Sequence, residues 1–314
     1  MKHLGMRLLQ LVFVLLAVTF MTTFLISRFR GGDEQIICSI LGPECGNEER
    51  AAELREDLHL DEPVFQRWTA WLNDALHGDL GISAATGLPV SELISGRAAV
   101  SIAIVIYAQI LALLIAVPLG VISAHRQGTF FDRAANTTAF GLLAMPNYVI
   151  ALLLILIFPF GIGIFPAVAS GDVGPFDIYQ LFLPSLALAL GLVAVYVRLL
   201  RTDMISTLQE DFVGMAKAKG MRTRRVLLGH ALRPSSLNLF TTIGLNFGNL
   251  LAGAVVIEVI FTIQGLGTLL TTAVAQRDIF VIQGVTAMIA VVFVVINFLV
   301  DTTYSILDPR IRRG

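Results

Sequence analysis

The sequence predicts an all-α integral membrane protein with six transmembrane helices and a small extracytoplasmic domain after the first helix. Its mean hydropathy is +0.79, and only 14% of its 314 residues are charged, which lies outside the range of ordinary soluble domains. Its apolar residues also fall in uncharged runs, and a run of about 20 such residues crosses a bilayer as one helix. Helices satisfy their own backbone hydrogen bonds in lipid, so helical spans are expected.

Six runs of this kind follow one another along the chain, near residues 8–27, 98–124, 134–160, 181–200, 236–260 and 281–307. The first follows Lys2 and Arg7, as in a signal peptide. It stays uncharged for about 20 residues, however, and no small-residue cleavage site follows it. We therefore expect this run to remain as a membrane anchor.

The positions of Lys and Arg predict the orientation, because these residues near helix ends are retained in the cytoplasm. The 161–180 segment has no Lys or Arg, and the 262–280 segment has only Arg277. The cations instead collect at the amino terminus, in the 125–133 turn, in the 201–233 loop and in the tail at 310–313. Both termini are therefore expected in the cytoplasm.

The remaining outside segment, residues 28–97, carries 13 acidic residues against six Arg and no Lys. We expect three parts: an end and first helix at 1–27, an extracytoplasmic domain at 28–97, and a membrane core at 98–314. Cys38 and Cys45, the only two cysteines, lie in the exported segment. An oxidising compartment permits a disulfide between them, and two free thiols are the alternative.

Two short helices are expected within this exported segment. The first covers residues 48–60 and ends before Pro63. The second begins there and places Phe65, Trp68, Leu72 and Leu76 on one side, at helical spacing, before Gly78. That side can pack on the membrane surface or on its own domain.

Polar groups inside the runs are few, and such groups in hydrocarbon usually face a bundle interior or a water-filled path. Prolines such as Pro146 interrupt the helices, which suits a pathway that bends or opens. From helix position we expect the pathway lining to include Asn246, Asn249, Ala252, Gly253 and Glu258. Glu258 and Asp301 can form an ion relay or have a structural role, and the structural role is preferred.

A basic loop at residues 201–234 holds five of the chain's 22 Lys and Arg residues between 217 and 225. We expect Asp203 to cap a helix that continues through Phe212 and Met215 to Lys219, where Gly220 ends it in the left-handed conformation. Thr223 is expected to cap a second helix, which Pro234 stops.

Charge alone leaves two interpretations of this hairpin: anionic lipid head groups, to which each cation contributes roughly 1 kcal/mol, or an acidic partner protein. The order AKAKG (216–220) followed by HALRP (230–234) resembles the cytoplasmic motif of the membrane subunits of ATP-binding-cassette (ABC) importers. In that family the loop forms a coupling helix that docks on an ATPase subunit. The resemblance implies a coupling role for Ala216, Lys217, Ala218, Lys219, Gly220, Arg222, Arg224, Arg225, His230 and Pro234.

Other stretches resemble the peptide-permease branch of the same family. They are GDLGIS (78–83), MPNYVIALLLILIF (145–158), VVIEVIFTIQGLGTLL (255–270), RDIFVIQG (277–284) and YSILDPRIR (304–312). Together they cover nearly the whole chain in order. The chain is similar to the B-type permease subunit of dipeptide or oligopeptide importers, which have the type I ABC importer permease fold.

This resemblance implies the partners: a homologous second permease subunit, two cytoplasmic ATPase subunits that bind ATP and Mg²⁺, an extracytoplasmic substrate-binding protein, a peptide substrate and membrane lipid, but no nucleic acid. The location implied is the bacterial cytoplasmic (inner) membrane. No G-x-x-x-x-G-K-[ST] phosphate loop occurs in the chain. The chain is thus expected to be a transport subunit without its own cofactor or enzymatic activity.

Two alternatives remain for the function. A related importer of nickel, glutathione or another small solute shares the same motifs. An ion-driven secondary transporter is disfavoured, because the spans show neither inverted repeats nor a titrating constellation. A metalloenzyme is also disfavoured, because the five His residues are scattered without a metal-ligand motif.

Overall fold

The computed structural model describes residues 2–27, 37–38, 41–42, 46–57, 61–171 and 173–307. Within these ranges the chain is helical, with a single isolated β-bridge between Ile82 and Pro89 and no β-strand. It forms two compact units. The first contains residues 1–101 and 264–298, and the second contains residues 102–263 and 299–314.

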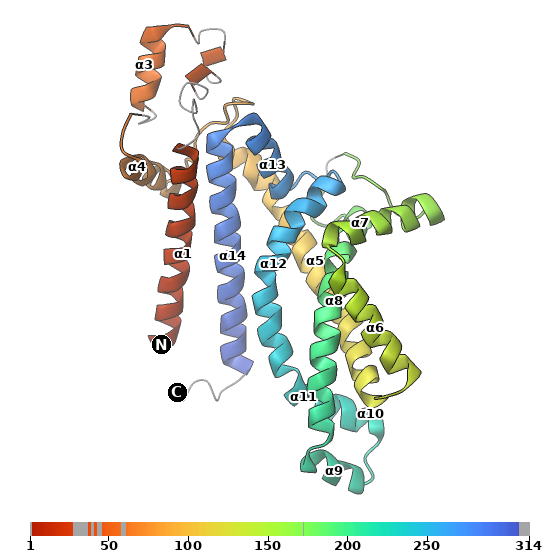
Figure 1. Ribbon diagram of the computed structural model, residues 1–314. Coiled ribbons are helices and arrows are strands. Elements are labelled where there is room, and N and C mark those ends of the chain that lie inside the picture. Colours follow the sequence, from red (N-terminus) through yellow and green to blue (C-terminus); the bar gives the residue numbers. More distant parts are fainter. Residues whose placement is uncertain are drawn as a thin grey trace. The chain divides into compact units, whose positions relative to one another are not determined.

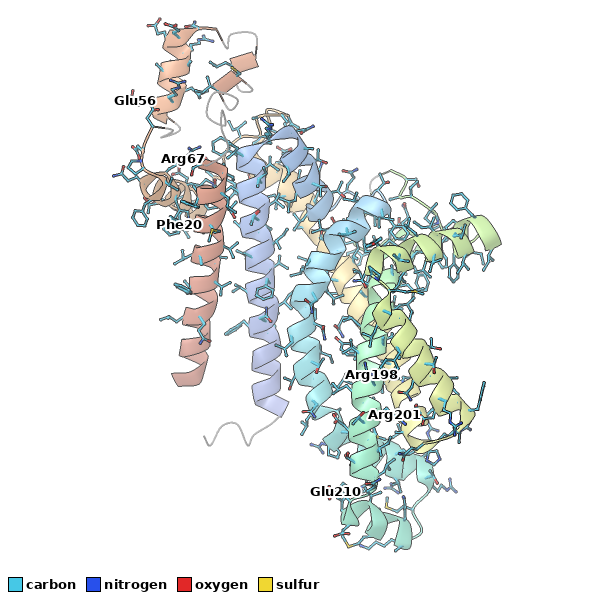
Figure 2. The ribbon with its side chains drawn as sticks, viewed as in Figure 1. Phe20, Glu56, Arg67, Arg198, Arg201 and Glu210 are labelled. Carbon is cyan, nitrogen blue, oxygen red and sulfur yellow. The ribbon has the colours of Figure 1, made fainter. Side chains whose placement is uncertain are left out.

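The first unit contains α1 (Lys2–Ser27), α3 (Glu48–Asp57) and α4 (Val64–Leu76). Helix α4 packs against α1 (Figure 1). The Trp68 indole donates to the Thr19 hydroxyl at 3.1 Å, and its ring meets the edge of Phe20, labelled in Figure 2, at a centroid distance of 5.5 Å. On the expected apolar side of α4, Trp68 and Leu72 are half-buried. Phe65 and Leu76 are exposed, because the packed face is centred on the buried Trp71.

The first unit also contains α13 (Leu266–Gln276), most of α14 (Ile279–Leu307) and the start of α5 (Val90–His125). An apolar core of Val90, Ile94, Leu266, Leu269, Ala273, Val281 and Val285 joins them. The segment before α5 is fastened by the buried Asp278, which accepts hydrogen bonds from the Ser83 hydroxyl at 2.6 Å and the Ala85 N–H at 3.2 Å. The expected 262–280 loop therefore contains a helix of its own.

The second unit is built around α8 (Ile178–Leu208), which packs against α6 (Phe130–Ala144), α7 (Asn147–Ile155) and α12 (Leu237–Ile260) (Figure 1). Helix α7 continues as the π-helix η2 (Leu156–Ile162). Leu188, Tyr196, Leu200 and Met204 of α8 are almost fully buried. The central position of α8 explains why its apolar residues occupy most of its circumference.

The expected span at 134–160 is wrong as a single helix. Helices α6 and α7 meet at an angle of 106°, because the residue before a proline avoids the helical conformation. Met145 is extended, with φ −97° and ψ 128°, and Pro146 is the N-cap of α7. The interruption predicted at Pro146 is thus present, and it separates two helices that run in different directions.

Four helices are long and apolar enough to cross a membrane by length and composition: α5, α8, α12 and the 279–299 part of α14. The bent pair would make a fifth. In α1 the apolar part found within the described residues, 12–27, is shorter than such a span. The count of six spans therefore remains a prediction, as do the domain boundaries at 27 and 97.

Candidate functional site

The basic hairpin, defined here as residues 209–235, contains α9 (Asp211–Ala218), α10 (Thr223–Arg225), the π-helix η3 (Val226–Ala231) and α11 (Leu232–Ser235). Its sharp turn has the predicted left-handed glycine, since Gly220 has φ +71°. The Gly220 N–H donates to the Lys217 carbonyl at 2.9 Å, and the Met221 N–H donates to the Ala216 carbonyl at 3.3 Å. These two bonds are the Schellman pattern that closes a helix at a glycine.

The turn is held by a small apolar cluster rather than by polar contacts. Val213, Ala216 and Val226 are buried together, and Leu208 and Met221 pack against them. Met221 follows the left-handed glycine directly, the position from which a side chain covers the preceding helical turn. Ala216, expected at the coupling surface, therefore contributes to the packing that holds the two helices together.

Three local expectations for this segment are wrong. Asp203 does not cap a helix, because α8 runs on to Leu208 and keeps Met204 in its buried face. Thr223 is the first residue of α10, and the N-cap is Arg222. Pro234 lies inside α11 rather than stopping the segment. The π-helical turn before it has wider backbone spacing, which accommodates a residue without an N–H.

The hairpin contains six Lys and Arg residues, the five between residues 217 and 225 and Arg233, and all six are exposed. Arg222, Arg224 and Arg225 line an open groove with Leu228 and Gly229. Exposed apolar side chains stand beside the cations, and Met215 is 60% exposed. The expected continuous helix through Phe212 and Met215 is wrong, because the chain breaks at Gln209 and Glu210 and α9 begins as a separate helix. Phe212 and Met215 are exposed on α9.

Exposed cations next to exposed large apolar side chains are typical of a surface that docks another protein. His230 is half-buried, and Pro234 and Ala218 are exposed. The sequence-predicted coupling residues thus lie on one hairpin, although not all of them contribute surface.

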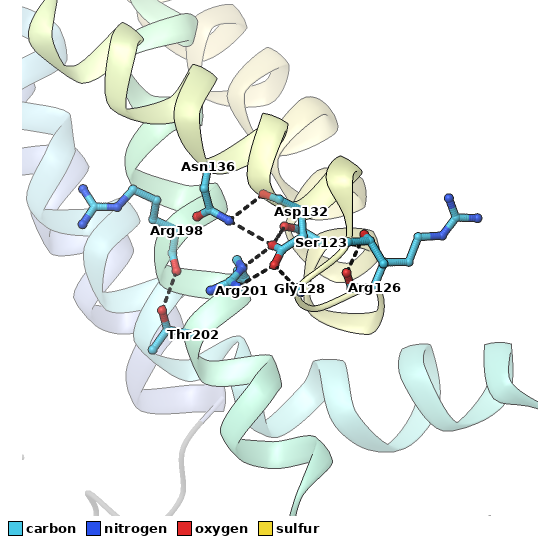
Figure 3. Close-up of polar contacts among 9 residues, drawn as sticks. Ser123, Arg126, Gly128, Asp132, Asn136, Arg198, Arg201 and Thr202 are labelled. Carbon is cyan, nitrogen blue, oxygen red and sulfur yellow. Dashed lines mark hydrogen bonds and ion pairs between the residues drawn. The ribbon is translucent and has the colours of Figure 1, made fainter.

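A buried polar cluster lies where α8 approaches the hairpin, and it joins three helices (Figure 3). Asp132 at the start of α6 is 3% exposed. Its carboxylate accepts from Arg201 Nε at 2.5 Å and Arg201 Nη2 at 2.8 Å, the paired geometry that fits a guanidinium. It also accepts from the Ser123 hydroxyl at 2.5 Å, the Gly128 N–H at 2.9 Å and the Asn136 amide at 2.9 Å.

Further contacts fasten the end of α8 to its neighbours. The Arg198 guanidinium lies 4.2 Å from the centre of the Phe140 ring on α6, and Figure 2 shows Arg198 and Arg201 on the same stretch of α8. The Ser235 hydroxyl donates to the Thr207 hydroxyl at 2.8 Å. The hairpin is therefore connected to α8 on both of its sides, through the chain itself and through Ser235.

The sequence interpretation did not identify Asp132 and Arg201 as a pair. They are 69 positions apart in the sequence, and neither lies in a motif. The only signal was that each is a charged residue at the edge of an apolar run. Such residues are numerous at membrane surfaces, so the pairing could be found only from the packing of α6 on α8.

The five pathway candidates all lie on α12, but the structure does not bring all five to one surface. Asn249 and Ala252 are exposed, and Asn246 is half-buried. Glu258 is buried. Gly253 packs closely against α8, since a Cβ at this position would lie 3.0 Å from Leu188 Cδ2. At Gly253 the two helices α8 and α12 therefore approach each other closely.

The cysteine prediction lies partly outside the described residues. Cys38 is disulfide-bonded in the structure. Cys45 is not among the described residues, so the pairing of the two remains a prediction.

Long apolar helices packed on a central helix define a multi-pass integral membrane protein, and its basic hairpin is an exposed, positively charged surface. Comparison with known families is consistent with this class: residues 116–313 match the model of the binding-protein-dependent transport system inner membrane component. The chain belongs to this family of membrane permeases.

Similar proteins cover between 84% and 98% of this chain. It is 35% identical over 311 residues to the oligopeptide transport system permease protein AppB of Bacillus subtilis, covering 97% of each chain. It is 34% identical to the dipeptide transport system permease protein DppB of Alkalihalophilus pseudofirmus, with 98% of each chain covered. The DppB of Escherichia coli K12 is 32% identical over 84% of this chain and 86% of its own.

Proposed function

We propose that this chain is the permease subunit of an ATP-driven importer of di- or oligopeptides, and that its basic hairpin docks on a separate ATPase subunit. The observation that carries the docking role is the hairpin itself. Its six exposed cations lie beside exposed Phe212 and Met215, and its turn is closed by the left-handed Gly220. The proposed substrate class comes from the similar proteins, which are named as permeases of oligopeptide and dipeptide transport systems.

In this proposal both termini and the hairpin are cytoplasmic, and the membrane is the bacterial cytoplasmic membrane. ATP and Mg²⁺ belong to two ATPase subunits, because this chain has no phosphate-loop motif. A homologous second permease would form the other half of the pathway, and an extracytoplasmic binding protein would deliver the peptide. This chain contributes geometry rather than catalysis.

The mechanism follows from the connections of α8. When ATP binding closes the ATPase pair, the docked hairpin moves with it. The hairpin continues directly into α8, and the Asp132–Arg201 contact fastens α8 to α6. The movement is then passed on as a rigid-body shift of packed helices rather than being absorbed locally. ATP hydrolysis would allow the return.

The experiment is uptake by the complete complex in liposomes. Labelled dipeptide, a longer peptide and nickel are compared in parallel, with and without ATP. Gly220→Pro removes the turn, because proline requires a φ near −65° and has no N–H to donate to Lys217. Gly220→Asn is the matched control, since asparagine tolerates the left-handed conformation.

Peptide uptake that requires ATP, is lost in Gly220→Pro and is kept in Gly220→Asn supports both parts of the proposal. Nickel uptake without peptide uptake would reject the peptide substrate and favour the related metal importers. Uptake without ATP would reject the importer class. Full uptake by Gly220→Pro, at a normal level of protein in the membrane, would reject the docking role of the hairpin.

A further inference from the structure

Four polar side chains from three helices of the second unit form a chain in the middle of the predicted spans. This polar chain consists of Gln109 on α5, Tyr196 on α8, and Asn246 and Asn249 on α12. The Tyr196 hydroxyl donates to Gln109 Oε1 at 3.1 Å, and it has the Asn246 side chain as a second hydrogen-bonding neighbour. Asn249 Nδ2 donates to Asn246 Oδ1 at 3.3 Å.

The hydrogen bonds of the polar chain have a fixed direction. Asn246 uses one N–H on the Thr242 carbonyl at 2.9 Å, and its other N–H is available to the Tyr196 oxygen because the Tyr196 proton goes to Gln109. The Asn246 oxygen must then face Asn249. This leaves Asn249 with its own carbonyl oxygen and one N–H directed away from the chain.

The polar chain runs from the interior to the surface of the second unit. Tyr196 is fully buried, and Gln109 is 6% exposed. Asn246 is half-buried and Asn249 is exposed. Asn249 and the small Ala252, three residues apart on α12, are both exposed.

The Gln109–Tyr196 contact is energetically unfavourable for a contact whose only role is to pack helices. Gln109 Nε2 is buried and has no hydrogen-bond partner within the part of the chain that the structure describes. A buried donor left in this way destabilises the fold, and an interhelical hydrogen bond in a membrane stabilises it by less on average. An apolar pair at positions 109 and 196 would be cheaper. The one bond that Gln109 does make fixes the direction of the Tyr196 hydroxyl.

We propose that the Asn249 amide is a subsite for the main-chain peptide group of the substrate, and that Tyr196 and Gln109 are positioning residues that orient it through Asn246. The inference rests on the proposed peptide importer. A peptide group presents one N–H and one C=O, which the free oxygen and N–H of Asn249 complement. The contact uses groups that every peptide has, so it suits a pathway that accepts many side chains.

The test removes from the substrate the peptide N–H that would donate to the Asn249 oxygen. The reconstituted complex is supplied with saturating binding protein that is preloaded with a dipeptide or with the same dipeptide N-methylated at its peptide bond. Loading of both ligands is measured directly, so that differences in the binding protein do not enter the uptake rate. The parent dipeptide should be transported roughly two- to tenfold faster, the range expected for one hydrogen bond.

In Asn249→Ala the rate ratio of the two peptides should fall to about one, and in Tyr196→Phe it should fall partly. Thr241→Val is the matched control on the same helix, because its hydroxyl only bonds the Leu237 carbonyl one turn earlier. That variant should keep the native ratio. Membrane level and thermal stability are measured for each variant.

An unchanged ratio in a well-folded Asn249→Ala variant would overturn the inference while leaving the peptide importer intact. Equal loss of both peptides in Tyr196→Phe, with reduced thermal stability and an unchanged ratio, would reduce Tyr196 to a structural residue and overturn the positioning role. Absence of ATP-dependent peptide uptake in the native complex would instead refute the proposed function itself.

Discussion

Replacing Asp132 by Asn keeps the shape of the side chain and removes the negative charge that Arg201 faces. In the native chain one carboxylate oxygen accepts from Ser123, Asn136 and Arg201, and the other accepts from Gly128 and Arg201. In Asn one of these oxygens becomes an NH₂ group, which is a donor. Either orientation therefore loses at least two hydrogen bonds and brings donors against donors.

The size of the effect follows from burial. Breaking a buried ion pair by removing one partner costs about 3–5 kcal/mol, because the other charge is left uncompensated. The Asp132 side chain is 4% exposed, but the Arg201 side chain is 22% exposed. Water can reach part of the orphaned guanidinium, so we expect the lower end, about 3 kcal/mol. A loss of this size is a large fraction of the stability of a typical domain.

The assay is denaturant unfolding of the purified chain in detergent, followed by far-ultraviolet circular dichroism. Asp132→Asn, Arg201→Gln and the double variant are compared. The double variant should be less destabilised than the sum of the single variants by at least about 1 kcal/mol, since it removes the unpaired charge. Asp211→Asn, an exposed position at the start of α9, is the control and should cost under about 1 kcal/mol. Additive single effects, or a cost for Asp132→Asn no larger than the control's, would refute the reasoning.

Three further changes test other contacts. In Gly220→Ala the added Cβ meets no neighbouring atom within 4 Å, but alanine is forced into φ +71°. The folded hairpin should therefore be destabilised by about 1–2 kcal/mol, and the measured affinity for the ATPase subunit should fall. An unchanged affinity would contradict this. Gly253→Ala would place its Cβ 3.0 Å from Leu188 Cδ2. This crowding should lower the free energy of unfolding by about 1–3 kcal/mol in the same assay. An unchanged unfolding midpoint would mean that α8 and α12 separate easily at this position. Ser83→Ala removes a donor from the buried Asp278 and should cost about 1–3 kcal/mol, seen as faster proteolysis of the 78–90 segment; equal cleavage rates would refute the role of this contact.

Features that depend on neighbouring residues in the chain were predicted well from the sequence. The left-handed turn at Gly220 needs only a glycine after an amphipathic helix, and the bend at Pro146 needs only the restriction that proline places on the residue before it. The apolar runs likewise predict the long helices. In each case the physical cause lies within a few positions of the observed feature.

Features that depend on packing were not predicted. The break at Gln209 and Glu210 has no clear signal in the sequence, so one continuous helix was expected through Phe212 and Met215. Gly253 was assigned to the pathway from its helix position, and the sequence does not show that Leu188 packs closely against it. The Asp132–Arg201 pair required the position of α6 on α8, which no spacing encodes.

The connection between the two proposed sites lies in α8. Arg201 and Tyr196 are five residues apart, which corresponds to about 7.5 Å along the helix axis. A shift of α8 that the hairpin imposes therefore acts on the Tyr196 hydroxyl almost directly, because a helix clamped at Arg201 moves as a rod. The Tyr196–Gln109 bond is 3.1 Å long, so a displacement of about 1 Å would weaken it beyond a useful hydrogen bond. Asn246 would then be free to turn, and Asn249 would lose its orientation. The amide that we propose for holding a peptide would thus depend on the position of the hairpin. Nucleotide binding in a partner could release the substrate in this way.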